Sequence, residues 1–323
     1  MVFRASAPVR LDFAGGWTDV APFPVRERGV VVNAAIELRA HAEVRPGGDR
    51  YVLHAEDLAE FQEIGGPGAL AQGGGLDLHK AALRRSDMGH CELRTRSDAP
   101  AGSGLGSSGA LDAVRGVERT RAQLAEQAFF LESVDAGLRG GRQDQYAAAF
   151  GGFHQFGFER GTVAVHPLTI EPAFAEELAR HIVICYTGVS RVSSNTIVRV
   201  TDAYERGDAT VTGALRALVH IAEEMGSALQ ASDLHRVARL LAANWLEQQR
   251  LDREMQTPGM ARLEAAMTQA GAYGGKAAGA GAGGSMFFVV EDPARAIQAA
   301  TGCGARVLPC RWADTGVTVE HAA

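Results

Sequence analysis

The segment DAPAGSGLGSSGA, at residues 98–110, has residue types and a spacing suited to chemistry. Its glycines let the backbone turn several amide groups inward, and its two serines stand where a helix is expected to begin. Unpaired amides and the positive end of a helix dipole attract anions, so the pattern predicts a phosphate-binding loop. The residues of this predicted loop are Gly102, Ser103, Gly104, Leu105, Gly106, Ser107 and Ser108.

Two other interpretations of this segment stay open. It could be a glycine-rich turn with a serine N-cap and no ligand. The pattern GxGxxG that begins at Gly104 also matches the dinucleotide-binding fingerprint, although residues 98–103 separate it from the preceding strand. The same pattern recurs at 279–284, so it is weak when taken alone, and the Walker pattern GxxxxGK[ST] is absent from the sequence.

Two acidic residues form a second candidate group. Glu132 lies near the end of a predicted helix, and Asp144 follows a glycine pair in GGRQDQY, at residues 140–146. Phosphoryl transfer needs a ligand for the metal that holds the nucleotide phosphates, and a carboxylate beside the attacking hydroxyl. Two separate acids suit that division, although Glu132 could be a solvated helix residue and Asp144 a helix N-cap.

A third candidate is the segment PVRLDFAGGWTD, at residues 8–19. A strand that carries Arg10 leads into a glycine turn, which presents Gly16, Trp17, Thr18 and Asp19. Carboxylate hydrogen bonds and an aromatic wall suit a polyhydroxylated ligand. The segment could also be only a tight turn, with Asp19 capping the element that follows.

Composition narrows the class of protein. The chain has 323 residues, enough for about two domains. Its net charge of −6 gives no positive field for a nucleic acid, so we expect no such partner. No 18-residue apolar run occurs, and the four cysteines show no metal-ligand spacing, so we expect a cytoplasmic protein with reduced thiols that does not enter a membrane.

The elements that must position these motifs are mixed strands and helices without a regular βαβ rhythm, which favours an α+β fold over a doubly wound sheet. We place the domain boundary between residues 168 and 169, and we expect residues 65–75 to form a surface loop. The expected strands cover 9–13, 30–44, 50–55, 91–97, 181–188, 286–290 and 305–309, with a hairpin at 153–168. The expected helices cover 122–133, 257–271, 293–302 and the region 193–255, broken near Gly207 and Ser232.

Together the three motifs resemble those of the galactokinase, homoserine kinase, mevalonate kinase and phosphomevalonate kinase superfamily, called GHMP. The third glycine-rich motif of that superfamily is similar to GAYGGKAAGAGAGG, at residues 271–284. The resemblance covers nearly the whole chain. It implies an N-terminal domain like domain 2 of ribosomal protein S5, over 1–168, and a ferredoxin-like C-terminal domain, over 169–323.

The resemblance also implies roles for the site residues, with ATP and magnesium as cofactors. Asp144 would orient or deprotonate a sugar hydroxyl with the support of Arg10. Ser108 and Glu132 would ligate magnesium, and the amides of 102–107 would cradle the nucleotide phosphates. The third motif, with Gly281, would close over the nucleotide. The implied substrate contacts are Gly16, Trp17, Thr18, Asp19, Arg142, Tyr186, Gly188 and Arg191.

Further segments resemble the sugar kinases that act at the anomeric hydroxyl, typified by heptose 7-phosphate kinases, whereas the GGWTD turn is close to that of fucokinases. These segments are GGRQDQYAAAFGGF at 140–153, YTGVSRVSSNTI at 186–197 and NWLEQQRL at 244–251. A heptose phosphate is therefore the first expectation and a hexose or deoxyhexose the second. A non-catalytic sugar and nucleotide sensor, and a decarboxylase of phosphorylated mevalonate, stay as alternatives on the same fold, and a homodimer is left open.

Two departures from the family pattern bear on specificity. The stretch after Ser108 looks shorter than usual and is rich in arginine, so the helix after the phosphate loop and the adenine pocket are not assigned. Arg142 stands where heptose kinases commonly have lysine, and its planar guanidinium differs from a compact ammonium. Recognition of a distal phosphate could change at that position.

Overall fold

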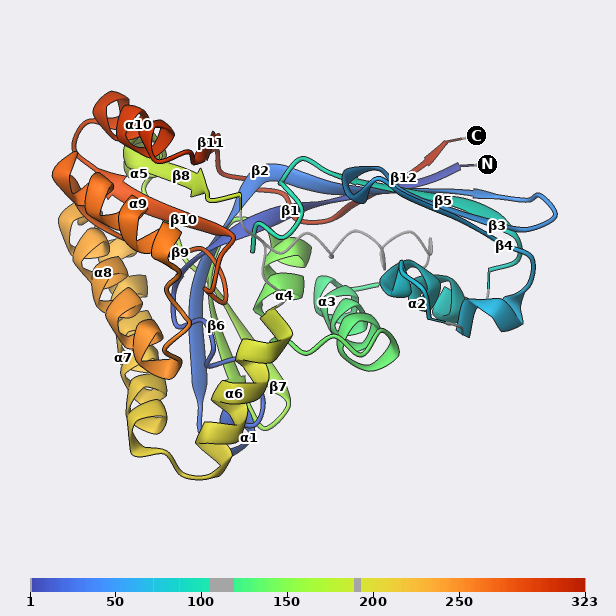
Figure 1. Cartoon of the computed structure of the whole chain (residues 1–323), viewed down its shortest axis with the longest axis horizontal. Coiled ribbons are helices and arrows are strands. Elements are labelled where there is room, and N and C mark those ends of the chain that lie inside the picture. The colour runs from blue at the N-terminus through green and yellow to red at the C-terminus, as the bar shows by residue number, and fades with distance from the viewer. Residues whose placement is uncertain (1, 72, 87, 105–118, 189–192, 323) are drawn as a thin grey trace.

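The computed structural model describes residues 2–71, 73–86, 88–104, 119–188 and 193–322. Within these ranges the chain forms two β-sheets with helices packed on them (Figure 1). This arrangement confirms the predicted α+β class. None of the helices in the described ranges is both long and apolar enough to cross a bilayer.

The first sheet has the strand order β12-β1-β2-β5-β3-β4, with β6 paired to β2 and β7 to β6. Two long strands, β1 and β2, run side by side through it and bend at breaks in their register. The strands of this sheet are β1 (Val2–Ala14), β2 (Gly29–Pro46), β3 (Tyr51–Ala55), β4 (Glu60–Ile64), β5 (Cys91–Ser97), β6 (Phe153–Glu159), β7 (Thr162–Pro167) and β12 (Thr318–Ala322).

Short helices accompany the first sheet, and α2, α3 and α4 lie below its extended end in Figure 1. A π-helical turn, η5, continues α3 toward the loop that precedes α4. These helices are α1 (Phe23–Arg26), η1 (Glu56–Leu58), η2 (Pro67–Ala71), α2 (Asp77–Ser86), α3 (Arg121–Phe130), η5 (Leu131–Asp135) and α4 (Gln143–Phe150).

The second sheet has the order β11-β8-β10-β9, and all of its pairings are antiparallel. Its strands are β8 (Ile182–Tyr186), β9 (Ala272–Ala277), β10 (Ser285–Val290) and β11 (Arg306–Leu308). The helices between β7 and β12 in sequence are α5 (Pro172–His181), α6 (Ser193–Glu205), α7 (Ala209–Gln230), α8 (Leu234–Leu251), α9 (Pro258–Gln269) and α10 (Pro293–Gly302). The predicted breaks lie between α6, α7 and α8, where Gly207 and Ser232 have positive φ.

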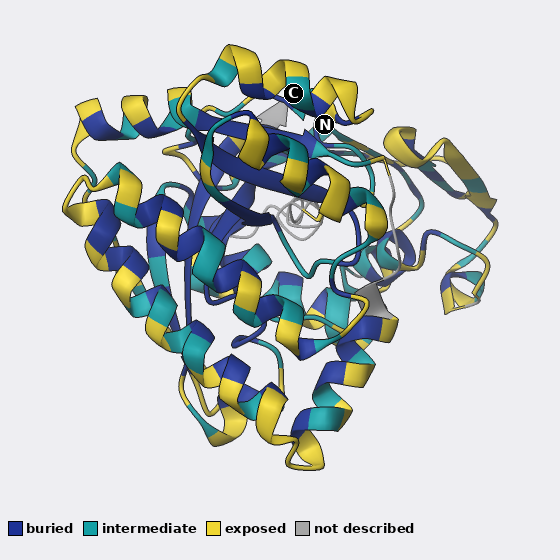
Figure 2. Ribbon diagram, turned by 60° about the vertical axis from the view of Figure 1, so that its left-hand side comes forward, coloured by how far each residue is buried: buried dark blue, intermediate teal, exposed yellow. Residues whose placement is uncertain are grey.

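The two sheets share one hydrophobic core. Phe13 of β1 meets Phe287 of β10 with 5.5 Å between ring centroids, and Leu229 of α7 and Leu241 of α8 belong to the same cluster. Figure 2 shows the buried strands inside and the exposed helix faces outside. The motifs on β1 and β9 are therefore held in one packed body.

Several elements in the described ranges were not predicted from the sequence, among them α1, α2, β4, β9 and β12. Strand β12 returns to pair with β1 in the first sheet, which a boundary at 168/169 does not anticipate. The expected surface loop at 65–75 contains η2, whose Leu70 is buried. Strand β9 lies within the glycine-rich third motif. Its Gly274 packs against α8, where an added Cβ atom would lie 2.0 Å from the carbonyl oxygen of Ala238.

Candidate active site

Arg10 joins the three predicted motifs. Arg10 lies on β1 with its side chain 4% exposed, and its Nε and Nη2 donate to Oδ1 of Asp144 at 2.8 and 2.6 Å. Its Nη1 donates to the carbonyl oxygens of Gly104 at 2.8 Å and Ala278 at 2.7 Å. One guanidinium therefore positions the acid, the phosphate loop and the third glycine-rich motif relative to each other.

Asp144 lies in the first turn of α4, whose N-cap is Arg142, so the interpretation of Asp144 as a helix N-cap is wrong. Both hydrogen bonds from Arg10 go to Oδ1, and in the described part of the chain Oδ2 has no partner. The side chain is 32% exposed and lines a cavity of about 160 Å³. Asp144 thus has one fixed oxygen and one oxygen available to a ligand.

Asp19 lies in the same cavity and is 2% exposed. Its Oδ2 accepts from the backbone N–H of Gln143 at 2.9 Å. Burial raises the pKa of the Asp19 carboxyl to about 6; the Gln143 amide opposes this rise, and the charge of Asp144 adds to it. Gly141 packs directly on this carboxylate, since an added Cβ atom would lie 1.9 Å from Oδ2.

The glycine turn before Asp19 brings Gly16 and Trp17 to the cavity wall. Trp17 has a φ of 81°, and its buried Nε1 has no hydrogen-bond partner among the described groups. The hydroxyl of Thr18 is buried and bonds to the backbone of Gly15 and Val30 at 2.7 to 3.0 Å. Thr18 therefore shapes the turn, and its predicted substrate contact stays a prediction.

The structure describes the start of the predicted phosphate loop, up to Gly104. Gly102 and Gly104 have positive φ, and Gly104 lines the cavity. The carbonyl oxygen of Ser103 accepts from the N–H of Ser285 at 2.9 Å, which fixes the loop to β10. Leu105, Gly106, Ser107 and Ser108 lie outside the described residues.

The third motif packs on the phosphate loop through glycines. An added Cβ atom at Gly279 would lie 2.5 Å from the carbonyl oxygen of Gly104, so only glycine fits there. Gly279 and Ala280 line the cavity, whereas Gly281, which sequence reasoning selected, has a φ of 85° and packs on Met255.

Glu132, in the π-helical turn η5, also lines the cavity, and its Oε2 accepts from Nε2 of Gln145 at 2.9 Å. Among the described residues, no group of three or more His, Cys, Asp or Glu side chains is arranged to hold a metal ion. Magnesium bound with a nucleotide needs only one or two protein carboxylates, because phosphate oxygens and water fill the other positions. A carboxylate at Glu132 fits that requirement.

The remaining predicted substrate residues have other contacts. Nε of Arg142 lies 3.3 Å from Oε1 of Glu126, and its guanidinium lies 4.1 Å from the centroid of the Phe129 ring. The hydroxyl of Tyr186 donates to the carbonyl oxygen of Ala101 at 3.2 Å, next to the phosphate loop. Gly188 has a φ of 75°, and Arg191 lies outside the described residues. These substrate assignments stay predictions.

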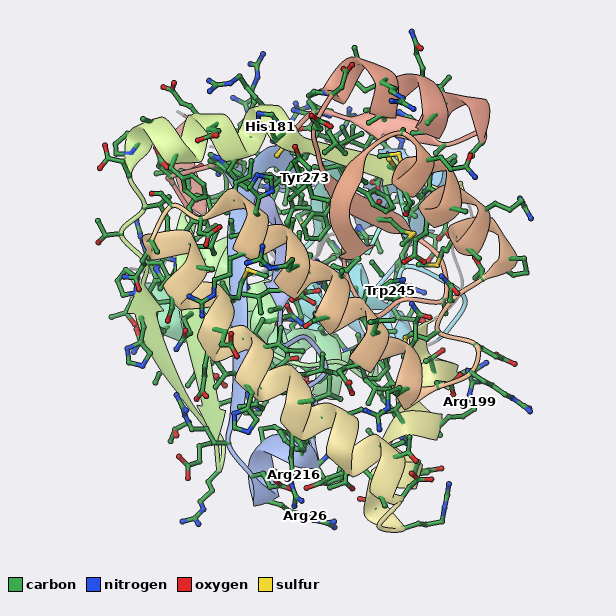
Figure 3. All side chains as sticks on the ribbon, turned by 90° about the vertical axis from the view of Figure 1, so that its left-hand side faces the viewer. Arg26, His181, Arg199, Arg216, Trp245 and Tyr273 are labelled. Atoms are coloured by element: carbon green, nitrogen blue, oxygen red, sulfur yellow. The ribbon has the colours of Figure 1, made fainter. Side chains whose placement is uncertain are left out.

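Two supporting side chains on α8 were not singled out from the sequence. Asn244 Oδ1 accepts from the N–H of Gly15 at 2.9 Å, and Gln248 Nε2 donates to the carbonyl oxygen of Gly279 at 2.8 Å. Trp245 points from α8 toward α9, where its Nε1 donates to Glu264 at 3.2 Å (Figure 3). The resemblance of the segment NWLEQQRL to sugar kinases was the sequence signal that could have identified these two residues. Asn244 holds the first motif, and Gln248 holds the third.

A buried ion pair also went unrecognised. Lys276 of β9 contacts Asp12 of β1, and both side chains are at most 1% exposed. Lys276 is one of two lysines in the chain, and the other is Lys80. Its position inside the third motif was the signal available in the sequence.

A larger hollow of about 500 Å³ lies at the far end of the first sheet, lined by residues of β1, β2, β5 and β12. Several of its charged side chains are paired with each other or with neighbours, as Arg4 is with Glu43 at 2.7 Å and Arg94 with Glu92 at 2.6 Å. None of its lining residues belongs to the three motifs. The smaller cavity is therefore the candidate active site.

Comparisons with known proteins identify the family of this chain. Residues 76–152 match the model of the GHMP kinases N terminal domain, and residues 225–307 match that of the GHMP kinases C terminal region. The predicted boundary at 168/169 lies between the two matched ranges and stays a prediction.

The chain is 32% identical over 306 residues to a D-glycero-alpha-D-manno-heptose 7-phosphate kinase of Campylobacter jejuni, a match that covers 89% of each protein. It is 27% identical to an L-fucokinase/L-fucose-1-P guanylyltransferase of Bacteroides fragilis, over 90% of this chain but 35% of that protein. The crystal structure of a D-glycero-D-manno-heptose 1-phosphate kinase from Bacteroides thetaiotaomicron superimposes with a TM-score of 0.79, 27% identity and 99% coverage of both chains. The chain therefore belongs to the GHMP kinase superfamily.

Proposed function

We propose that this protein is an ATP-dependent sugar kinase that phosphorylates the anomeric hydroxyl of a heptose 7-phosphate or a related sugar. The observation that carries the proposal is the position of Arg10, which binds Asp144 and the backbone of both glycine-rich motifs. Relatives named as heptose phosphate kinases support the substrate class. Because ATP is held inside the cell, we expect the reaction in the cytoplasm.

The proposed reaction is a direct in-line transfer. As the sugar oxygen bonds to the γ-phosphorus and the bond to ADP breaks, Oδ2 of Asp144 orients the sugar hydroxyl and accepts its proton. Arg10 holds Oδ1 in place, and its buried positive charge offsets the charge that develops nearby. Asp19 accepts hydrogen bonds from other sugar hydroxyls, and Trp17 supplies an apolar wall.

Magnesium and the nucleotide complete the proposal. The amides of 102–107 would hold the nucleotide phosphates, and Glu132 with Ser108 would ligate the metal. Magnesium bound there would neutralise phosphate charge. Because Glu132 lines the same cavity as Asp144, a metal held there would bring the nucleotide phosphates into the cavity where the sugar hydroxyl is activated.

A fucose or hexose 1-kinase is the second candidate, supported by the GGWTD turn and by the fucokinase relatives. A coupled assay of ADP release with heptose 7-phosphate, fucose, galactose and mannose separates the candidates, and phosphorus NMR locates the new ester. Turnover only with heptose 7-phosphate, with a new anomeric ester, is the expected result. Binding of a sugar and ATP without turnover above background would favour the sensor and overturn the proposal.

A further inference from the structure

The loop between η5 and α4, residues 136–142, is held at both ends. The N–H of Ala136 donates to the carbonyl oxygen of Leu131, and the N–H of Leu138 donates to that of Glu132, each at 2.9 Å. At the other end, Gly141 packs on the carboxylate of Asp19. The residues between these two anchors, Arg139 and Gly140, are thereby placed in the wall of the active-site cavity.

The charges that line this cavity are mostly negative. The described lining includes four carboxylates and two arginines, and one of these, Arg10, is bound to Asp144. The four carboxylates are Asp12, Asp19, Glu132 and Asp144. In the described ranges, the other arginine, Arg139, is an exposed side chain without an ion pair. Asp144 is paired with Arg10, and Asp12 is paired with Lys276. Within the described lining, Arg139 is therefore the cationic side chain left to bind an anionic group of the substrate.

Arg142, three residues later, is not available in the same way. Its Nε lies 3.3 Å from Oε1 of Glu126, and its guanidinium covers the ring of Phe129. The hydroxyl of Tyr146 donates to the same Glu126 oxygen at 2.8 Å, so this carboxylate is itself fixed. Arg142 is not among the residues that line the cavity.

We propose that Arg139 is the specificity residue that binds a phosphoryl group carried by the sugar at the end remote from the reacting hydroxyl, an inference that rests on the proposed kinase function. Guanidinium groups bind phosphate through two parallel N–H donors, which gives both charge and direction. The nucleotide also carries phosphates. The nucleotide phosphates are expected at the phosphate loop and the third motif, which reach the cavity through Gly104 and Gly279. The loop of Arg139 instead packs on Asp19, the carboxylate proposed to bind the sugar hydroxyls.

The test compares Arg139→Met with Arg142→Met, which removes the same charge three residues away. We expect Arg139→Met to lower kcat/KM for heptose 7-phosphate by about 10- to 100-fold, the loss of a charge-assisted pair, and to leave the unphosphorylated heptose within about threefold. The KM for ATP should stay unchanged in both variants. Arg139→Lys should recover part of the loss, because it restores charge without the planar fork.

Calorimetric binding of heptose 7-phosphate without nucleotide separates this inference from the proposed function. If the wild-type protein binds the sugar phosphate in an Arg139-dependent manner but never transfers phosphate, the site stands and the kinase proposal fails. If the wild-type protein turns over sugars and Arg139→Met affects both sugars equally, the inference alone fails. It also fails if Arg139→Met raises the KM for ATP, which would identify the nucleotide as the anion, or if Arg142→Met causes the selective loss.

Discussion

Nζ of Lys276 lies 2.9 Å from Oδ2 of Asp12 and 2.6 Å from the backbone oxygen of the same residue, with both side chains removed from solvent. The pair joins β9 of the second sheet to β1 of the first, two residues from Arg10. Burial lowers the pKa of the Lys276 ammonium, and the Asp12 carboxylate opposes that change. The contact is therefore a charged link inside the core, beneath the candidate active site.

Lys276→Met should destabilise the protein by about 3–5 kcal/mol, because it leaves the Asp12 carboxylate buried without a counter-charge. Urea unfolding followed by circular dichroism measures the loss. The double variant Asp12→Asn/Lys276→Met should be less destabilised than the sum of the two single variants, since neither charge then remains alone. Additive losses would contradict a coupled pair.

Gly141→Ala should lower kcat/KM for the sugar by about 10- to 100-fold, because the new methyl group would overlap the Asp19 carboxylate and displace it. The KM for ATP should not change. Gly140→Ala is the matched control, because an added Cβ atom there has no neighbour within 4 Å. Equal effects of the two substitutions in steady-state kinetics would show that the contact with Asp19 does not matter.

Much of the fold followed from local patterns in the sequence. The β-branched and alternating residues predicted most of β2, over 30–44, but only residues 9–13 of the longer β1. Positive φ at Gly207 and Ser232 agrees with the predicted helix breaks. Strand β9 was not predicted, because its sequence AYGGKA contains two glycines, which are uncommon inside a strand. They are needed because α8 passes so close that a side chain at Gly274 would strike the backbone of Ala238.

Several of the predicted site residues lie around one cavity, and their roles stay predictions. Arg10 and Asp144 were expected to act together, and the structure places them in contact. By contrast, the pairing of Asp12 with Lys276 depends on how the two sheets pack, which no local spacing records. The availability of Arg139 in place of Arg142 likewise depends on a tertiary contact with Glu126.

The buried carboxyl of Asp19 predicts a pH-dependent stability. Its pKa rises from 3.8 when solvated to about 6 in the folded protein, so the folded state binds the proton more tightly. This contribution is fully present below about pH 3.8 and is lost as pH rises through about 6. The free energy of unfolding of the wild type relative to Asp19→Asn should therefore fall by about 2 kcal/mol between about pH 4.5 and about pH 7.5.

Urea unfolding of both proteins at the two pH values measures this difference. Asp202→Asn serves as the control, because it makes the same substitution at an exposed position of α6. A wild-type minus Asp19→Asn difference that does not vary with pH would contradict the buried, protonatable carboxyl.

Asp144→Asn should reduce kcat by about 10²- to 10⁴-fold, because an amide cannot accept the proton of the sugar hydroxyl. The affinity for ATP should stay within about threefold, since the amide keeps the size of the side chain and its oxygen can still accept from Arg10. Calorimetry with a non-hydrolysable ATP analogue measures the affinity, and the coupled ADP assay measures kcat. If Asp144→Asn turns over normally, another group takes the proton. If it loses both turnover and ATP affinity, the change has disturbed the Arg10 contact to Gly104 rather than removed a base.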